Sequence, residues 1–203
     1  MRYGLTETHQ LKKPQMLPNF NLKPGEKLSD ILIEKKIDTF HKAVKYVHKL
    51  SYGRNRVAEN YWTIVSEGKG TCSTKHAFLT ALANENNIYS IRLVLSMYFM
   101  SSTNTPKIAE VLNKYKLDHI LEAHSCLCYG GMHYDYTFPN TLKKPWETSM
   151  ISEEYIDVDQ IGEYKITQHK SLIDDWIKRD NIPYTLEEIW SIREECIEAF
   201  AKP

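Results

Sequence analysis

One cysteine of this chain is placed where its thiol would be reactive. Cys72 follows the glycine-containing segment Gly68-Lys-Gly-Thr and begins a stretch with the pattern of an amphipathic helix. The N-terminus of a helix carries unpaired N–H groups and a partial positive charge, and both favour thiolate over thiol. Because a thiolate is a strong nucleophile, we expect Cys72 to attack an electrophile if the chain also supplies a base.

A predicted β-hairpin brings a histidine close to an aspartate. Residues 119–129 and 132–138 have the pattern of two strands joined by Gly130-Gly131, a pair suited to a two-residue turn. In that register His124 and Asp135 are diagonal neighbours on one face of the hairpin. The carboxylate would then orient the imidazole and stabilise its charged form. We expect the Cys72 helix to pack on this same face, with thiol, imidazole and carboxylate in a line.

The order of these residues resembles the transglutaminase-like branch of the papain-like cysteine enzymes. The shared pattern is Gly-x-Gly-x-Cys at a helix start, a histidine opening a strand, and an aspartate on the next strand followed by Tyr-Thr. The similarity covers roughly residues 38–140. It implies that Cys72 is the nucleophile, His124 the general base and acid, and Asp135 the orienting group.

The resemblance implies a cysteine-dependent amide hydrolase or acyltransferase that acts on a peptide or protein amide through a thioester. No cofactor is needed for this chemistry. The Cys72 N–H is the expected oxyanion donor, and Trp62 or Asn60 precedes it at a spacing where a second donor or substrate contact could sit. The alternative is a catalytically inactive transglutaminase-like domain that binds a peptide or protein partner.

Other histidines are rivals for the role of base. His76 lies one helical turn after Cys72 and could reach the thiol. His119 and His133 are weaker candidates, and we expect His133 near the exposed turn to lie at the surface.

A metal site is a third interpretation of the hairpin. Cys126 and Cys128 share a face with His133 and Asp135, and these side chains are all soft or borderline ligands for zinc. Small thiols under a packed helix explain the cysteine pair without a metal, so our prediction includes none.

The composition excludes several classes of partner. Lys and Arg total 26, as do Asp and Glu, so the formal net charge is zero and neither a nucleic-acid nor a polybasic membrane surface is expected. The first residues lack the apolar run of a signal peptide, and no apolar stretch has the length of a membrane span. Four cysteines are too few for a disulfide scaffold. We therefore expect a soluble, cytoplasmic protein.

The periodicity predicts an α+β fold in which an antiparallel β-sheet packs against helices. Expected elements are helices over 27–50, 57–66 and 72–83, a strand over 91–99, a helix that opens at Pro106, the hairpin, and helices beyond Pro145. With the resemblance, this gives an extended N-terminal arm over 1–25, a papain/transglutaminase-like core over 26–144, and a mainly helical C-terminal extension over 145–203 that packs on the core.

Overall fold

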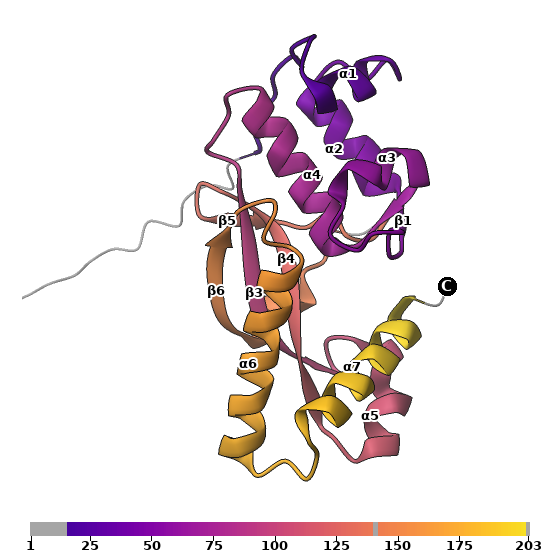
Figure 1. The fold of residues 1–203 in the computed structure, drawn as a ribbon, viewed down its shortest axis with the longest axis vertical. Helices are drawn as coiled ribbons and strands as arrows, with labels where there is room; N and C mark the ends of the chain where they lie inside the picture. The colour runs from indigo at the N-terminus through magenta and orange to yellow at the C-terminus, as the bar shows by residue number, and fades with distance from the viewer. Residues whose placement is uncertain (1–15, 140–141, 202–203) are drawn as a thin grey trace, which may run out of the picture.

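The computed structural model describes residues 16–139 and 142–201. These residues form seven α-helices, a four-stranded antiparallel sheet and a short parallel strand pair, so the predicted α+β class is confirmed (Figure 1). Most of the predicted arm, residues 1–15, lies outside the described residues. In its remainder Leu17 and Leu22 are buried, and the Leu22 N–H donates to the Asp38 carbonyl at 2.8 Å.

Two helices replace the single helix predicted over residues 27–50. Helix α1 spans Lys27–Ile33 and α2 spans Phe40–Lys49. Between them Lys36 has a φ of 62°, which a continuing right-handed helix does not allow. Thr39 then caps α2, since its side chain accepts a hydrogen bond from the Lys42 N–H.

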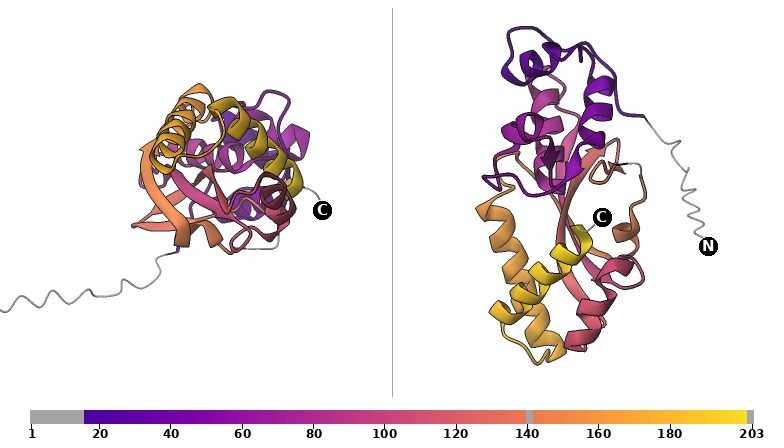
Figure 2. Two further views of the ribbon diagram at one scale, coloured as in Figure 1. Left: turned by 90° about the horizontal axis from the view of Figure 1, so that it is seen from below. Right: turned by 90° about the vertical axis from the view of Figure 1, so that its right-hand side faces the viewer.

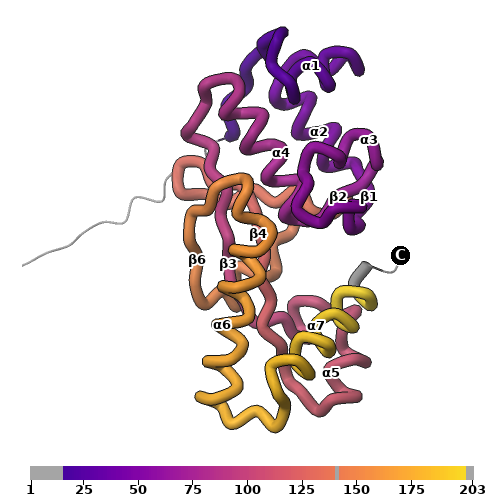
Figure 3. The backbone as a smooth tube through the Cα atoms, in the orientation of Figure 1, coloured from indigo at the N-terminus to yellow at the C-terminus, as the bar shows by residue number. Residues whose placement is uncertain are grey.

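A compact turn region precedes the cysteine helix. The 3₁₀-helix η1 (Tyr61–Thr63) leads into α3 (Ile64–Glu67), so the helix predicted over 57–66 begins later than expected. Strand β1 (Ser51–Tyr52) pairs in parallel with β2 (Lys69–Gly70), as the backbone trace in Figure 3 shows. Helix α4 (Cys72–Glu85) follows β2 directly and is buried over most of its length.

The four-stranded sheet has the order β5-β4-β3-β6. It consists of β3 (Arg92–Ser101), β4 (His119–Tyr129), β5 (Met132–Tyr134) and β6 (Met150–Ile156). The predicted hairpin register is confirmed, because Tyr129 pairs with Met132 and Cys128 with His133. Strand β5 is shorter than predicted, and β6 was not predicted: the segment beyond Pro145 was expected to be helical, yet it adds an edge strand to β3.

Helix α4 packs on the face of the sheet opposite to the one expected. Its Ala77 lies in one apolar cluster with Leu93, Leu95 and Ala123, whose side chains point away from the face of His124. On β3 that face carries Leu93, Leu95 and Met97, whereas the His124 face carries Ser96 on β3 and Glu122 on β4. Ser125 of β4 is a polar residue on the α4 side, and its hydroxyl lies 3.4 Å from that of Ser73 in the helix. The apolar side chains of α4 are therefore buried on the side where β3 is more apolar.

Three helices cluster around the far end of the long strands. Helix α5 (Ala109–Tyr115), preceded by η2 (Pro106–Ile108), packs with α6 (Glu163–Asp180) and α7 (Leu186–Ala201), while η3 (Pro145–Ser149) leads into β6. The right-hand view of Figure 2 shows α7, in yellow, rising from this end toward the N-terminal helices. No helix within the described ranges has the length and apolar character needed to cross a membrane.

Candidate active site

The start of helix α4 is held by a capping box and a close approach of backbone. The Thr71 side chain accepts from the Thr74 N–H, and the Thr74 hydroxyl accepts from the Thr71 N–H. Gly70 leaves no room for a side chain, since an added Cβ would lie 2.9 Å from the Thr74 hydroxyl oxygen. The prediction that Cys72 begins a helix is confirmed, and its N–H is among those that lack a partner within the helix.

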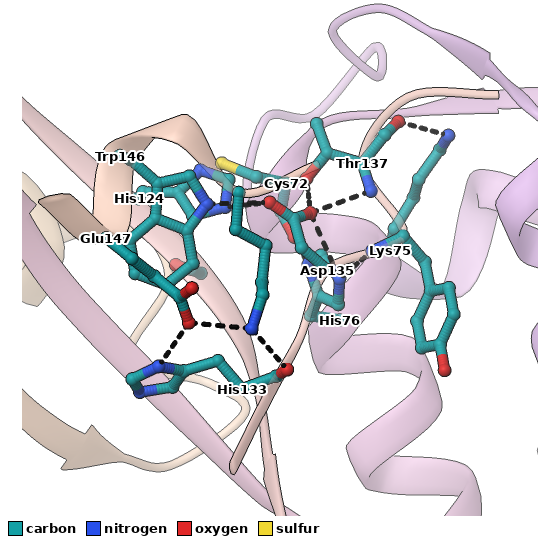
Figure 4. Close-up of polar contacts among 12 residues, drawn as sticks. Cys72, Lys75, His76, His124, His133, Asp135, Thr137, Trp146 and Glu147 are labelled. Atoms are coloured by element: carbon teal, nitrogen blue, oxygen red, sulfur yellow. Dashed lines mark hydrogen bonds and ion pairs between the residues drawn. The ribbon is translucent and has the colours of Figure 1, made fainter. Parts of the chain in front are cut away.

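The structure brings Cys72, His124 and Asp135 together (Figure 4). The Nε2 of His124 lies 2.8 Å from an Asp135 carboxylate oxygen. The Cys72 sulfur borders the same cavity as this imidazole, whose charge and hydrogen bonding act on the pKa of the thiol, and Nδ1 is the ring nitrogen that Asp135 does not engage. His124 and Asp135 are buried, while Cys72 is partly exposed. The arrangement is that of a thiol, a base and an orienting carboxylate.

Asp135 is held by four hydrogen bonds that fix the carboxylate plane. One oxygen accepts from the Thr137 N–H at 2.9 Å and from the Thr137 hydroxyl at 2.5 Å. The other accepts from His124 and from the indole N–H of Trp146 at 2.9 Å. Burial alone would raise the pKa of Asp135, but the charge and hydrogen bond of His124 outweigh it and hold the pKa well below its usual range. The carboxylate therefore stays ionised.

Lys75 anchors the segment that follows Asp135. Its ammonium donates to the Leu50 carbonyl at 2.6 Å and to the Thr137 carbonyl at 2.7 Å. Burial lowers its pKa to about 8 despite the opposing charge of Asp135. The bond from Lys75 to the Thr137 carbonyl joins α4 to the segment beyond β5, where the chain leaves the sheet after Tyr134.

Two cations act on the Cys72 sulfur. Burial would raise the pKa of the thiol, but the charges of Lys165 and His124 outweigh it, and the pKa falls to about 6. The Lys165 ammonium lies 3.9 Å from the sulfur and donates to the Ser73 hydroxyl at 2.8 Å. A hydrogen bond from the Ser125 backbone also favours the thiolate. The sulfur is thus surrounded by groups that stabilise its negative charge.

His124 is stabilised in its charged form. Burial would lower the pKa of its imidazole, but the charges of Asp135 and Cys72 and their hydrogen bonds raise it to about 10. The pKa of Cys72 is lowered and that of His124 is raised, so between these two values the residues form a thiolate–imidazolium pair. The ring of Trp146 lies 5.0 Å from that of His124 and shields the His–Asp bond.

His76, the rival base, has both ring nitrogens committed to the backbone. Its Nδ1 lies 2.7 Å from the Cys72 carbonyl, and its Nε2 accepts from the Tyr136 N–H at 2.8 Å. The proton must therefore sit on Nδ1. Burial lowers the pKa of this histidine to about 4, so the ring is neutral. It joins the helix start to the segment after Asp135 and has no free nitrogen for the thiol.

The other candidate histidines and cysteines have separate environments. His133 contacts carboxylate oxygens of Glu147 at 3.0 Å and Glu153 at 2.8 Å, and His119 packs against Trp176. Cys126 and Cys128 are buried in the cluster that also contains Trp146. Across residues 16–139 and 142–201, no group of three or more His, Cys, Asp or Glu side chains is arranged to hold a metal ion.

Trp62 and Asn60 are not brought to the sulfur. The Asn60 side chain accepts from the Trp62 N–H at 3.1 Å and so begins the helix η1. The ammonium of Lys27, the first residue of α1, lies over the Trp62 ring at 4.0 Å from the ring centre, so Trp62 packs against α1. Neither residue lines the cavities at Cys72, so we do not assign them an oxyanion role.

Cys72 lies between two cavities that meet at the sulfur. The first, of about 250 Å³, is here called the aromatic cavity and is lined by Tyr52, Tyr98, His124, Phe138, Trp146 and Ile197. The second, of about 430 Å³, is called the polar cavity and is lined by Arg54, Thr71, Ser73, Lys165, Arg193 and Glu194. Tyr52, Glu122 and Ile197 border both, so a substrate can extend to either side of the thiol.

Several residues of the site were not predicted from the sequence. Lys165 and Arg193 come from α6 and α7, where charged residues on a helix face are usually solvated. Trp146 follows Pro145, and the sequence there indicated only a boundary between two segments of the chain. Ser125 acts through its backbone, which no side-chain pattern reveals.

Comparisons with protein-family models, curated proteins and solved structures found no match. The likeness to transglutaminase-like enzymes therefore remains a hypothesis that rests on the sequence pattern around Cys72, His124 and Asp135.

Proposed function

We propose that this protein is a cysteine-dependent amide hydrolase or acyltransferase with a papain/transglutaminase-like core, and that it acts on a peptide or protein amide. The observation that carries the proposal is the environment of His124, which is hydrogen-bonded to a buried carboxylate and borders one cavity with a partly exposed thiol whose pKa it lowers. Such an arrangement suits nucleophilic catalysis by cysteine.

The steps of the reaction follow from the charges of the site. The Cys72 thiolate adds to the amide carbonyl carbon, and the Cys72 N–H stabilises the oxyanion. The imidazolium of His124 donates its proton to the leaving amine as the C–N bond breaks, which leaves a thioester on Cys72. His124 then takes a proton from water or from an acceptor amine, whose oxygen or nitrogen attacks the thioester and releases the thiolate.

Reducing conditions suit this chemistry. The four cysteines, all within the described residues, are free, and a reactive thiolate persists only where oxidation is reversed. The proposal includes the cytoplasm as the place of this activity.

A burst experiment with p-nitrophenyl acetate tests the proposal. We expect one p-nitrophenolate per chain to be released rapidly and one acetyl group to appear on Cys72 by mass spectrometry. Cys72→Ser should abolish the burst, while Cys196→Ser, which removes a buried thiol outside the site, should keep it. A wild-type protein that releases no burst and carries no acetyl group on Cys72 would support the inactive, partner-binding alternative instead.

A further inference from the structure

The two cavities at Cys72 are not equivalent with respect to His124. The imidazole lines the aromatic cavity, together with Asp135 and Trp146, and it does not line the polar cavity. The polar cavity instead contains Ser73 and the Lys165 ammonium on its side of the sulfur. The imidazolium, which is the general acid of the proposed reaction, therefore lies on one side only of a substrate carbonyl at the thiol.

This asymmetry orients an amide substrate. The general acid must lie within hydrogen-bond reach of the nitrogen that leaves, so the amine half of the amide has to lie on the His124 side. By microscopic reversibility, an amine that resolves the thioester enters from that same side. The acyl half then lies in the polar cavity, beside Lys165.

The aromatic cavity offers little hydrogen bonding to a bound group. Glu122 is occupied by two bonds of 2.6 Å from the guanidinium of Arg193. The Asn104 amide nitrogen donates to the Phe99 carbonyl and to the Ser149 hydroxyl. Thr105, Thr137 and Lys143 also border the cavity, beside His124 and Asp135 of the site. Most of the surface is nevertheless made by aromatic and aliphatic side chains, chiefly Tyr52, Tyr98, Phe138, Trp146 and Ile197.

The size of the aromatic cavity suits a large apolar group. Its volume is about 250 Å³. A cavity of about 150 Å³ lined by apolar side chains already binds benzene. A ring with a short linker therefore fits, and its burial against aromatic walls is favourable. A small polar amine would leave most of the cavity walls without contacts.

We propose that the amine half of the substrate carries a bulky apolar group, which binds in the aromatic cavity, and that amines of this kind are the preferred acceptors of the acyl group. This inference rests on the proposed function, because it requires a thioester on Cys72. In the transfer step the amine nitrogen bonds to the carbonyl carbon and the C–S bond breaks. His124 takes the proton from the nitrogen, which restores the thiolate–imidazolium pair.

The test measures how acceptor amines divert the acetyl-enzyme formed from p-nitrophenyl acetate. Benzylamine and methylamine are compared at equal concentrations of free base, and N-acetyl product is measured against acetate. We expect benzylamine to give at least about tenfold more amide than methylamine, with saturation as the cavity fills. Equal yields from the two amines after a normal burst would overturn this inference and leave the proposed function standing. An absent burst would overturn both.

Variants of the cavity wall sharpen the test. Phe138 lines the aromatic cavity and not the polar cavity, and its ring stacks on that of Tyr52 with 4.7 Å between the ring centres. Phe138→Ala should lower the preference for benzylamine about fivefold or more, and Phe138→Leu should keep most of it, because the apolar wall is retained. Tyr89→Ala, at an exposed surface position, is the control and should leave the preference unchanged. A Phe138→Ala protein that folds and keeps the full preference would contradict the assignment of this cavity. If that variant does not fold, the wild-type comparison decides the inference alone.

Discussion

The ammonium of Lys165 lies 3.9 Å from the sulfur of Cys72, although the two residues are 93 positions apart in the chain. Lys165 belongs to α6 and Cys72 to α4, so the packing of these helices near the sheet adds a second cation to the one provided by His124. The thiol therefore has positive charge on two sides. This contact leads to the first prediction.

Lys165→Met should raise the pKa of the Cys72 thiol. The substitution keeps a long apolar side chain and removes one of the two charges that favour the thiolate, so we expect a rise of about one unit. The measurement is the pH dependence of the thiolate absorbance or of iodoacetamide labelling. Lys178→Met, on the exposed side of the same helix, is the matched control and should leave the pKa of Cys72 unchanged. An unchanged pKa in Lys165→Met would show that His124 alone stabilises the thiolate.

The wild-type thiol should react as if its pKa were about 6. Because the folded-state pKa lies below the ordinary value for cysteine, about 8.5, labelling by iodoacetamide should already be near its maximum at pH 7.5. Cys126, Cys128 and Cys196 are buried and should label only after unfolding. Peptide mapping after timed labelling checks both statements, and equal labelling of all four cysteines would contradict them.

Asp135→Asn should weaken the nucleophile while the fold persists. The imidazolium loses its counter-charge, so the pKa of His124 falls and that of Cys72 rises, and labelling at pH 6.5 should slow about tenfold. The single oxygen of asparagine can keep the bonds from Thr137, but its NH2 group then faces the indole N–H of Trp146, so some stability is lost as well. Trp146→Phe removes one bond to the carboxylate and keeps its charge, so its effect should be smaller. Unchanged labelling in Asp135→Asn would assign this residue a structural role only.

The two buried histidines should respond differently to substitution. His124→Ala removes the hydrogen-bonded partner of the thiol and should abolish the acylation burst. His76→Gln breaks at least one bond to the backbone of Cys72 or Tyr136, and we expect a loss of stability of about 1–3 kcal/mol with most of the labelling rate kept. Urea unfolding and labelling kinetics measure the two effects separately. A His124→Ala protein that keeps the full burst and labelling rate would show that His124 is not the base.

The pair Glu122–Arg193 should be a main source of acid sensitivity. Burial would raise the pKa of Glu122, but the charge and hydrogen bonds of Arg193 outweigh it and lower the pKa to about 2. The pKa of a glutamate in the unfolded chain is about 4.3, so the folded-state pKa of Glu122 is the lower of the two. The ionised pair therefore stabilises the fold fully above about pH 4.3, and this stabilisation is lost as the pH falls toward 2.

Substitution of Arg193 distinguishes the stability contribution of this buried pair from that of a surface ion pair. Arg193→Met leaves the buried Glu122 uncompensated and should cost about 3 kcal/mol at pH 7. Arg54→Met breaks a more exposed ion pair with Glu194 and should cost under about 1 kcal/mol. Urea unfolding at pH 7 and pH 4 checks both values. Equal losses in the two variants would contradict the role given to the buried pair.

Local signals were sufficient for the parts of the site that lie on neighbouring elements. The glycines before Cys72 mark the start of α4 in the sequence, and the structure adds the Thr71–Thr74 capping box that holds it. The Gly130-Gly131 turn determines the register of β4 and β5, and from that register the closeness of His124 and Asp135 follows.

Tertiary packing explains what the sequence did not reveal. Strand β6 is an exposed edge strand whose Ser-Glu-Glu segment lacks an alternating apolar face, so its pairing with β3 depends on the rest of the sheet. The face on which α4 packs was decided by the side chains of β3. Lys165 and Arg193 reach the site only through the packing of α6 and α7, which no local pattern encodes.

The order of these elements along the chain has a consequence during synthesis on the ribosome. Cys72 and His124 leave the exit tunnel first, while the α6 lysine and the last helix, which contributes Ile197 to both cavity walls, emerge later. Until α6 has emerged, the nascent polypeptide lacks the lysine charge that, together with His124, lowers the pKa of the Cys72 thiol. A thiol that gains its full acidity only at that stage is less exposed to premature oxidation beside other unfinished chains.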